Sequence, residues 1–306
     1  MSKRRQVYAG KITGNSRRTT CRFHLFTPDA EGVMEQIFWY CLAVSANEHD
    51  IAVYAATLLS THPHYSTGDR SGRLPKFKQM FHRILAMCTK RFRNWDESVF
   101  NRSAPGEHEL LTPQAMVNDL AYTIANGATS GAVRRSADWP GAKTLATDIG
   151  TLVVRVERPP YWFNPRNPKW PKVAELKLEV PELLLEHYGS LEAVHVAVAE
   201  RVAELEEEAA RELASEGRSF QGVRRVLRGK PTDRSRTPIV SGQRNPEFAA
   251  GGDKVALRAA IALRRAFDAA YDDALAKWRD GDRDVVFPFG TWWMRVHHRA
   301  RCATSR

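Results

Sequence analysis

The chain has 306 residues, 43% hydrophobic and 26% charged, so it is long enough to bury one or two cores and lacks the composition of a disordered or fibrous protein. Lys and Arg outnumber Asp and Glu by 46 to 35, a surplus that favours a polyanionic partner such as nucleic acid. No apolar run is long enough to span a bilayer, and we find no signal-peptide pattern and no C-x-x-C pair, so we expect no membrane partner and a reduced, cytoplasmic location.

The first half of the chain alternates predicted strands and helices. Residues 21–26 are rich in aromatic side chains and predict a short strand. Residues 31–47 carry apolar side chains at three- and four-residue spacing, which predicts a helix with one buried face. Residues 51–59 are almost all apolar, as in a strand at the centre of a sheet, and residues 60–66 continue as strand.

Two more helices are predicted before residue 150. Pro75 begins a helix with one apolar stripe, whose other faces carry six basic side chains, namely Lys76, Lys78, Arg83, Lys90, Arg91 and Arg93. Thr112 as the N-cap and Pro113 at the first helical position begin another helix, which we expect to end at Asn126-Gly127. This order predicts an α+β fold for residues 1–150, with a ferredoxin-like antiparallel sheet and helices on its faces.

The rest of the chain has a different character. Residues 151–185 are rich in proline and aromatic residues, which predicts either a linker or an extended strap packed through its aromatic rings. Residues 186–306 form a mostly helical and basic extension, with helices near 190–215 and 253–278 and a strand-like segment at 285–295. Trp292 and Trp293 in that segment are either core residues or a stacking surface for single-stranded nucleic acid.

Two weak signals suggest chemistry. His62 and His64 are two residues apart on a predicted strand, so both imidazoles face one side and could hold a divalent cation; a polar patch at the end of a strand is the alternative. Asn118, Tyr122 and Asn126 follow at four-residue intervals on a predicted helix, where a tyrosine and an amide could meet the same cation, although a solvated helix face gives the same pattern.

Together these motifs resemble a known family. The motifs are, in chain order, His62-Pro63-His64, a basic helix, Tyr122 to Asn126, and Asp138-Trp139-Pro140. In this order they resemble the REP-associated tyrosine transposases, which belong to the single-tyrosine HUH transposase superfamily. The resemblance covers about residues 18 to 145, and the sequence would be a long form with a C-terminal extension. Pro63, Thr123 and Gly127 depart from the family pattern, but the four side chains that the pattern requires are all present.

The resemblance implies a function. It places the metal ligands, for Mg²⁺ or Mn²⁺, on His62, His64 and Asn126, and the nucleophile on Tyr122. It implies cleavage and rejoining of single-stranded or hairpin DNA through a 5′-phosphotyrosine link, in a cytoplasmic, nucleoid-associated protein that could act as a homodimer. The alternatives are a domesticated protein that binds DNA hairpins without cleaving them, and an unrelated basic protein in which His62 and His64 are incidental.

We expect the basic helix to contact DNA phosphates, which position a nucleic acid without reading its sequence. Arg102 falls where the family often has an arginine in a Phe-x-Gly-Arg motif, and we expect it near DNA as well. For each of these side chains a solvated surface position is the alternative. The sequence leaves the DNA target and its polarity open.

Overall fold

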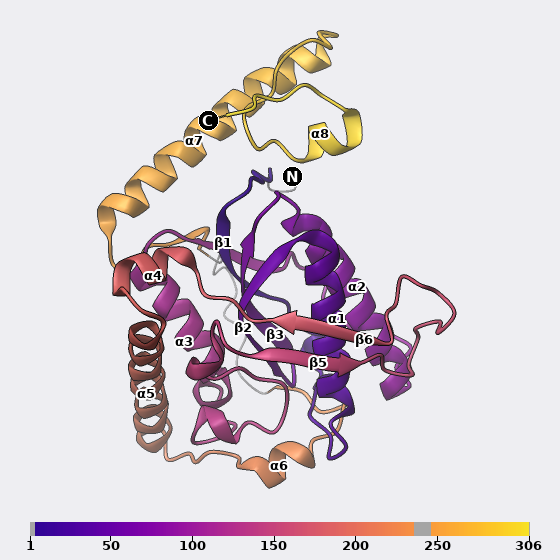
Figure 1. Cartoon of the computed structure of the whole chain (residues 1–306), viewed down its shortest axis with the longest axis vertical. Helices are drawn as coiled ribbons and strands as arrows, with labels where there is room; N and C mark the ends of the chain where they lie inside the picture. Colours follow the sequence, from indigo (N-terminus) through magenta and orange to yellow (C-terminus); the bar gives the residue numbers. More distant parts are fainter. Residues whose placement is uncertain (1–3, 236–245, 306) are drawn as a thin grey trace.

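The structure is a computed structural model that describes residues 4–235 and 246–305, and it is built around a five-stranded sheet with helices on both faces (Figure 1). The strand order is β2-β3-β1-β4-β7, and every pair is antiparallel except β4 with β7. The strands are β1 (Lys11–Ser16), β2 (Ile51–Leu59), β3 (His62–Asp69), β4 (Gly106–Leu110) and β7 (Phe248–Ala249). The predicted α+β class with a mostly antiparallel sheet is confirmed.

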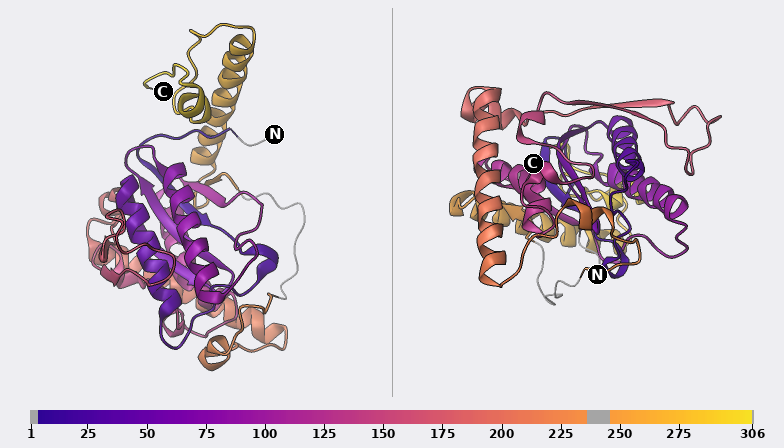
Figure 2. Two further views of the ribbon diagram at one scale, coloured as in Figure 1. Left: turned by 90° about the vertical axis from the view of Figure 1, so that its right-hand side faces the viewer. Right: turned by 90° about the horizontal axis from the view of Figure 1, so that it is seen from below.

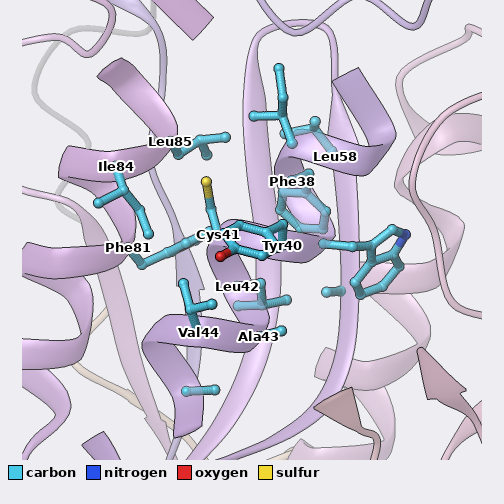
Figure 3. Packing of buried hydrophobic residues seen from close by; sticks show 14 of the residues in the cluster. Phe38, Tyr40, Cys41, Leu42, Ala43, Val44, Leu58, Phe81, Ile84 and Leu85 are labelled. Carbon is cyan, nitrogen blue, oxygen red and sulfur yellow. The ribbon is translucent and has the colours of Figure 1, made fainter. Parts of the chain in front are cut away.

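One face of the sheet is covered by α1 (Val33–His49) and α2 (Leu74–Arg93). Figure 3 shows how Phe38 and Cys41 of α1 meet Phe81 and Leu85 of α2. These side chains are fully buried, as expected where two helices pack on each other and on a sheet. The apolar periodicity of residues 31–47 and the stripe after Pro75 therefore predicted both helices correctly.

The other face of the sheet is covered by α3 (Pro113–Thr129), with α4 (Glu182–Tyr188) and α5 (Leu191–Ser215) packed outside it (Figure 1). The hydroxyl of Thr112 accepts a hydrogen bond from the amide of Ala115, so the predicted N-cap is confirmed. A buried carboxylate, Glu206 of α5, accepts hydrogen bonds from the amide and hydroxyl of Ser136 and joins α5 to the loop after α3.

The proline-rich segment packs on the outside of α1. It connects β5 (Val153–Glu157) to β6 (Val173–Lys177), an antiparallel pair that packs on α1 and crosses its axis (Figure 1). Phe163 and Trp170 are buried there, and the ring of Phe163 lies 4.9 Å from that of Tyr40. The aromatic side chains thus attach this segment to the body of the protein.

The C-terminal helices are α6 (Val223–Leu227), α7 (Lys254–Arg279) and α8 (Trp293–His298), and α7 projects from the body (Figure 2, left). Phe267, Tyr271 and Phe287 form a small core between α7 and the last segment. The N-terminal segment also reaches this unit, because Arg4 pairs with Asp272 and the amide of Val7 donates to the carbonyl of Gly290 at 2.8 Å.

Three sequence predictions are wrong. Residues 21–26 are not a strand: Thr20–Arg22 is a 3₁₀ turn, and Cys21 has a φ of 47°. The strand β1 (Lys11–Ser16), which precedes this turn in the chain, was not predicted from the sequence. Residues 285–295 form isolated bridges at Phe287 and Thr291 followed by the start of α8, and α3 continues beyond Asn126-Gly127 to Thr129.

Further 3₁₀ turns are Ser136–Asp138 and Ala146–Asp148. None of the helices in the described part of the chain has the length and apolarity that crossing a lipid bilayer requires.

Candidate active site

His62, His64 and Ser66 alternate with apolar residues along β3 and share the face of the sheet that α3 covers. The imidazole rings of His62 and His64 lie with their centroids 4.7 Å apart. Nδ1 of His62 is 2.7 Å from the hydroxyl of Thr61, which leaves Nε2 for another partner. The two histidines are therefore adjacent on one face, as their spacing predicted.

Both histidines are held in the neutral state. Burial lowers the pKa of His62 well below its ordinary value, and nearby His64, Arg18 and Arg22 lower it further. Burial likewise lowers the pKa of His64 to about 4, against the opposing effect of Asp119. Neutral imidazole is the form that coordinates metal ions.

Tyr122 of α3 faces this histidine pair. Its ring centroid is 5.4 Å from that of His64, and the two rings meet edge to face at 83°. The side chain remains 45% exposed, so the phenol is open to a ligand from solvent. The structure therefore brings together residues that are about sixty positions apart in sequence.

Asn126 lies one helical turn after Tyr122 and is only 3% exposed. Its side-chain nitrogen is buried and has no hydrogen-bond partner among the residues that the structure describes. Because the nitrogen and oxygen of an amide are assigned from their hydrogen bonds, turning the amide over would put an equally unpaired oxygen there. A buried amide without a partner is what a ligand or metal ion would satisfy.

His62, His64 and Asn126 are the residues that could hold a divalent metal ion. In the described ranges, no three His, Cys, Asp or Glu side chains converge as a metal site, so a site at the two imidazoles would need a further ligand, such as the oxygen of Asn126. Two neutral nitrogens and one amide oxygen leave positions open for oxygen atoms of a phosphate.

A hydrogen-bonded group beside these residues was not predicted from the sequence. Asp119, one turn before Tyr122 on α3, accepts from the hydroxyl of Ser66 and lies 2.9 Å from Nε2 of His108 on β4. Gly14 of β1 lies between Ser66 and His108 in the sheet, and a Cβ there would come within 2.1 Å of Asp119. Only the pairing of three strands brings these residues together, and no spacing in the sequence indicates it.

Two arginines add positive charge near Tyr122. Arg18 follows the end of β1, and burial lowers its pKa, with the charge of Arg22 acting in the same direction and Tyr122 opposing. The same two arginines lower the pKa of His62. Positive charge around a phenol and two neutral imidazoles makes this face attractive to a phosphate group.

The predicted DNA-binding residues separate into two groups. Lys76, Arg83, Arg91 and Arg102 are exposed. Lys78 is buried in an ion pair with Glu107 at 2.7 Å, Lys90 donates to the carbonyl of Asp96, and Arg93 donates to the carbonyls of Leu25 and Thr27. These last three side chains are paired within the protein, whereas the DNA contacts of the four exposed ones stay a prediction.

The C-terminal tryptophans also differ from each other. Trp292 is buried, whereas Trp293 is 56% exposed and its ring lies 3.9 Å from that of His297. Trp292 therefore belongs to the interior, and a stacking role for the exposed Trp293 stays a prediction.

No protein-family model matches the chain, and no curated protein matches it. Among solved structures, part of the chain is similar to one described as "Structure of the REP associates tyrosine transposase bound to a REP hairpin". The identity is 17%, the TM-score is 0.38, and the match covers 48% of this chain and 84% of that one. A likeness this low decides neither family nor activity, so membership of the transposase family stays a prediction and the functional assignment rests on the side chains described above.

Proposed function

We propose that this protein is a metal-dependent endonuclease and strand transferase that acts on single-stranded or hairpin DNA, with Tyr122 as the nucleophile. The observation that carries the proposal is the contact of Tyr122 with His64, at 5.4 Å between ring centroids, while the phenol remains open to solvent. The unpaired amide of Asn126, one turn away, supports a ligand at the same place.

The reaction is an in-line exchange at phosphorus. The phenolic oxygen of Tyr122 attacks a DNA phosphodiester, so that a bond from tyrosine to phosphorus forms and the bond from phosphorus to the 3′ oxygen breaks. The phenol loses its proton and the departing 3′ oxygen gains one, which leaves a 5′-phosphotyrosine and a free 3′-hydroxyl. Attack by another 3′-hydroxyl on the phosphotyrosine reverses these bonds without an external energy source.

The protein side chains supply position and charge. A phenol is a weak nucleophile at neutral pH, so its oxygen and the phosphorus have to be held close and in line. A divalent cation bound by His62, His64 and Asn126 would neutralise charge on the phosphate oxygens. Arg18 is placed to attract the same phosphate, and the edge-to-face contact with His64 limits the positions that the Tyr122 ring can take.

A covalent adduct is the direct test. Purified protein is incubated with Mn²⁺ and labelled hairpins that carry single-stranded flanks, taken from palindromes next to the gene, and the products are separated on a denaturing gel. We expect a DNA-linked protein band with the wild-type chain, none with Tyr122→Phe, and none after chelation of the metal. Tyr188→Phe on α4 is the matched control and should form the adduct normally, because its ring packs with α4 and α5.

Two results would contradict the proposal. An adduct that persists in Tyr122→Phe would move the nucleophile elsewhere. Salt-sensitive hairpin binding by the wild-type protein, with no adduct on any of these hairpins, would instead support a protein that binds DNA hairpins without cleaving them.

A further inference from the structure

A second basic feature lies on the opposite face of the sheet from Tyr122. A pocket of about 430 Å³ opens between α2 and residues 98–102. Arg17, Arg83 and Arg102 line it, and none of the described residues that form its wall is acidic. A concave site with three arginines and no carboxylate suits an anionic ligand.

Arg17 is fixed within this pocket. Its Nη1 lies 3.1 Å from Nδ1 of His82, and its guanidinium lies 4.8 Å from the centre of the Phe100 ring. Burial lowers the pKa of His82 well below its ordinary value, so Nδ1 is an unprotonated acceptor, and Nε2 faces the hydroxyl of Tyr65 at 2.9 Å. The buried core of the sheet therefore holds the guanidinium in place.

The charge of Arg17 is not neutralised by its surroundings. Among the described residues no carboxylate lies within ion-pair distance of Arg17, and its Nε is buried without a hydrogen-bond partner. Arg17 is partly buried, and this burial lowers the pKa of its guanidinium because removing a charge from water is costly. An anion in the pocket would offset that cost.

The pocket and the candidate active site meet at the end of β1. Arg17 and Arg18 are consecutive in the segment that continues β1, so one side chain enters the pocket and the other approaches Tyr122. The amide of Asn101 donates to the carbonyl of Arg18 at 3.1 Å, and Thr19 forms a bridge with Phe100. The wall of the pocket is thus attached to the backbone that separates the two sites.

We propose that this pocket is a second DNA subsite, which binds a backbone phosphate of the single strand as it leaves the active site around the end of β1. Arg17 provides the fixed guanidinium, and the exposed Arg83 and Arg102 close on the phosphate from α2 and from the loop. The identity of the ligand as single-stranded DNA rests on the proposed function; the preference for a phosphate rests on the pocket itself.

Binding is measured in the Tyr122→Phe background, so that cleavage does not interfere, by fluorescence anisotropy with labelled hairpins that carry single-stranded flanks. Arg83→Gln and Arg102→Gln should each weaken binding by roughly 5- to 10-fold and reduce the salt dependence by about one phosphate contact. Arg166→Gln is the matched control, because Arg166 is exposed in the segment between β5 and β6, does not line the pocket and is not among the predicted DNA-binding residues. Its effect should be clearly smaller.

The length of the flank gives a second readout. With the flank shortened one nucleotide at a time, the difference between Arg102→Gln and the parent should vanish once the strand no longer reaches the pocket. Thermal melting of each variant checks that its fold is intact. The proposal is wrong if Arg83→Gln and Arg102→Gln bind like Arg166→Gln, or if their effect is the same on a hairpin with no flank.

The two proposals fail separately. Adduct formation by the wild-type protein combined with normal binding by the pocket variants would overturn the subsite and leave the nuclease in place. Weakened binding by the pocket variants without any adduct would do the reverse.

Discussion

Consecutive residues of β3 enter two different environments. Tyr65 points to the face covered by α2, where it is fully buried against Phe77 and Phe81. His64, one position earlier, points to the face covered by α3 and contacts the exposed Tyr122. One face of the sheet is thus packed like an interior, while the other keeps polar side chains beside solvent.

The difference shows how stability and chemistry are separated in this fold. On the α1 and α2 face, large aromatic and aliphatic side chains form the main core. On the α3 face, Asp119 and Asn126 are buried polar residues, and such groups cost stability unless they are bonded. Because neighbouring residues of a strand face opposite sides, the core can offset that cost without contacting the polar site.

Removing a core ring should have the largest effect on stability. Phe81 is fully buried and stacks on Phe77, so Phe81→Ala should lower the free energy of unfolding by about 3–5 kcal/mol. Urea unfolding followed by circular dichroism measures the change. The protein that remains folded should still form the Tyr122 adduct at low temperature; specific loss of the adduct would show that the two faces are not independent.

A change on the face that α3 covers should slow the reaction strongly and lower stability only slightly. Asp119→Asn keeps the shape of the side chain but removes the charge that Ser66 and His108 contact, and we expect adduct formation to slow by about 10- to 100-fold. Its loss in unfolding free energy should be about 1–2 kcal/mol, well below that of Phe81→Ala. Single-turnover cleavage and urea unfolding measure the two effects.

Asn118→Ala on the same helix is the control for this variant, because the Asn118 side chain accepts a hydrogen bond from Gln114 and makes none to Ser66, His108 or Asp119 among the described residues. It should leave the cleavage rate unchanged. Equal losses from Asp119→Asn and Asn118→Ala would mean that the network around Asp119 has no specific part in the reaction.

The smallest expected effect is on how the free energy of unfolding depends on pH, through His82 on the face of the sheet that α1 and α2 cover. Burial keeps the pKa of His82 well below 6.5, so the folded protein resists a proton that the unfolded chain accepts. The stability that comes from keeping His82 neutral in the folded protein is complete above pH 6.5. It is lost as the pH falls below that value, by at most about 1.4 kcal/mol per pH unit. Urea unfolding at pH 7, 6 and 5 should show a weaker pH dependence for His82→Gln than for the wild-type chain, and equal slopes would contradict this.

Local patterns predicted the five long helices α1, α2, α3, α5 and α7 because apolar periodicity, an N-cap threonine and a first-turn proline act within a few residues, whereas the short helices α4, α6 and α8 were not predicted. The strand at 21–26 was a wrong prediction, because Leu25 and Phe26 are buried by packing in a loop and form no strand. β1 was missed for the converse reason. Its sequence, Lys11–Ser16, is short and polar, and it becomes a central strand only because β3 and β4 pair with it on either side.

The spacing of His62 and His64, and of Tyr122 and Asn126, was enough for the sequence to indicate a candidate site and the kind of chemistry it could hold. Only the tertiary structure decided that Tyr122 meets His64, that Asp119 and His108 join the group, and that Lys78 and Arg93 are occupied within the protein. The reason is physical: a helix or strand period fixes which residues share a face, whereas contacts between elements depend on how the whole chain packs.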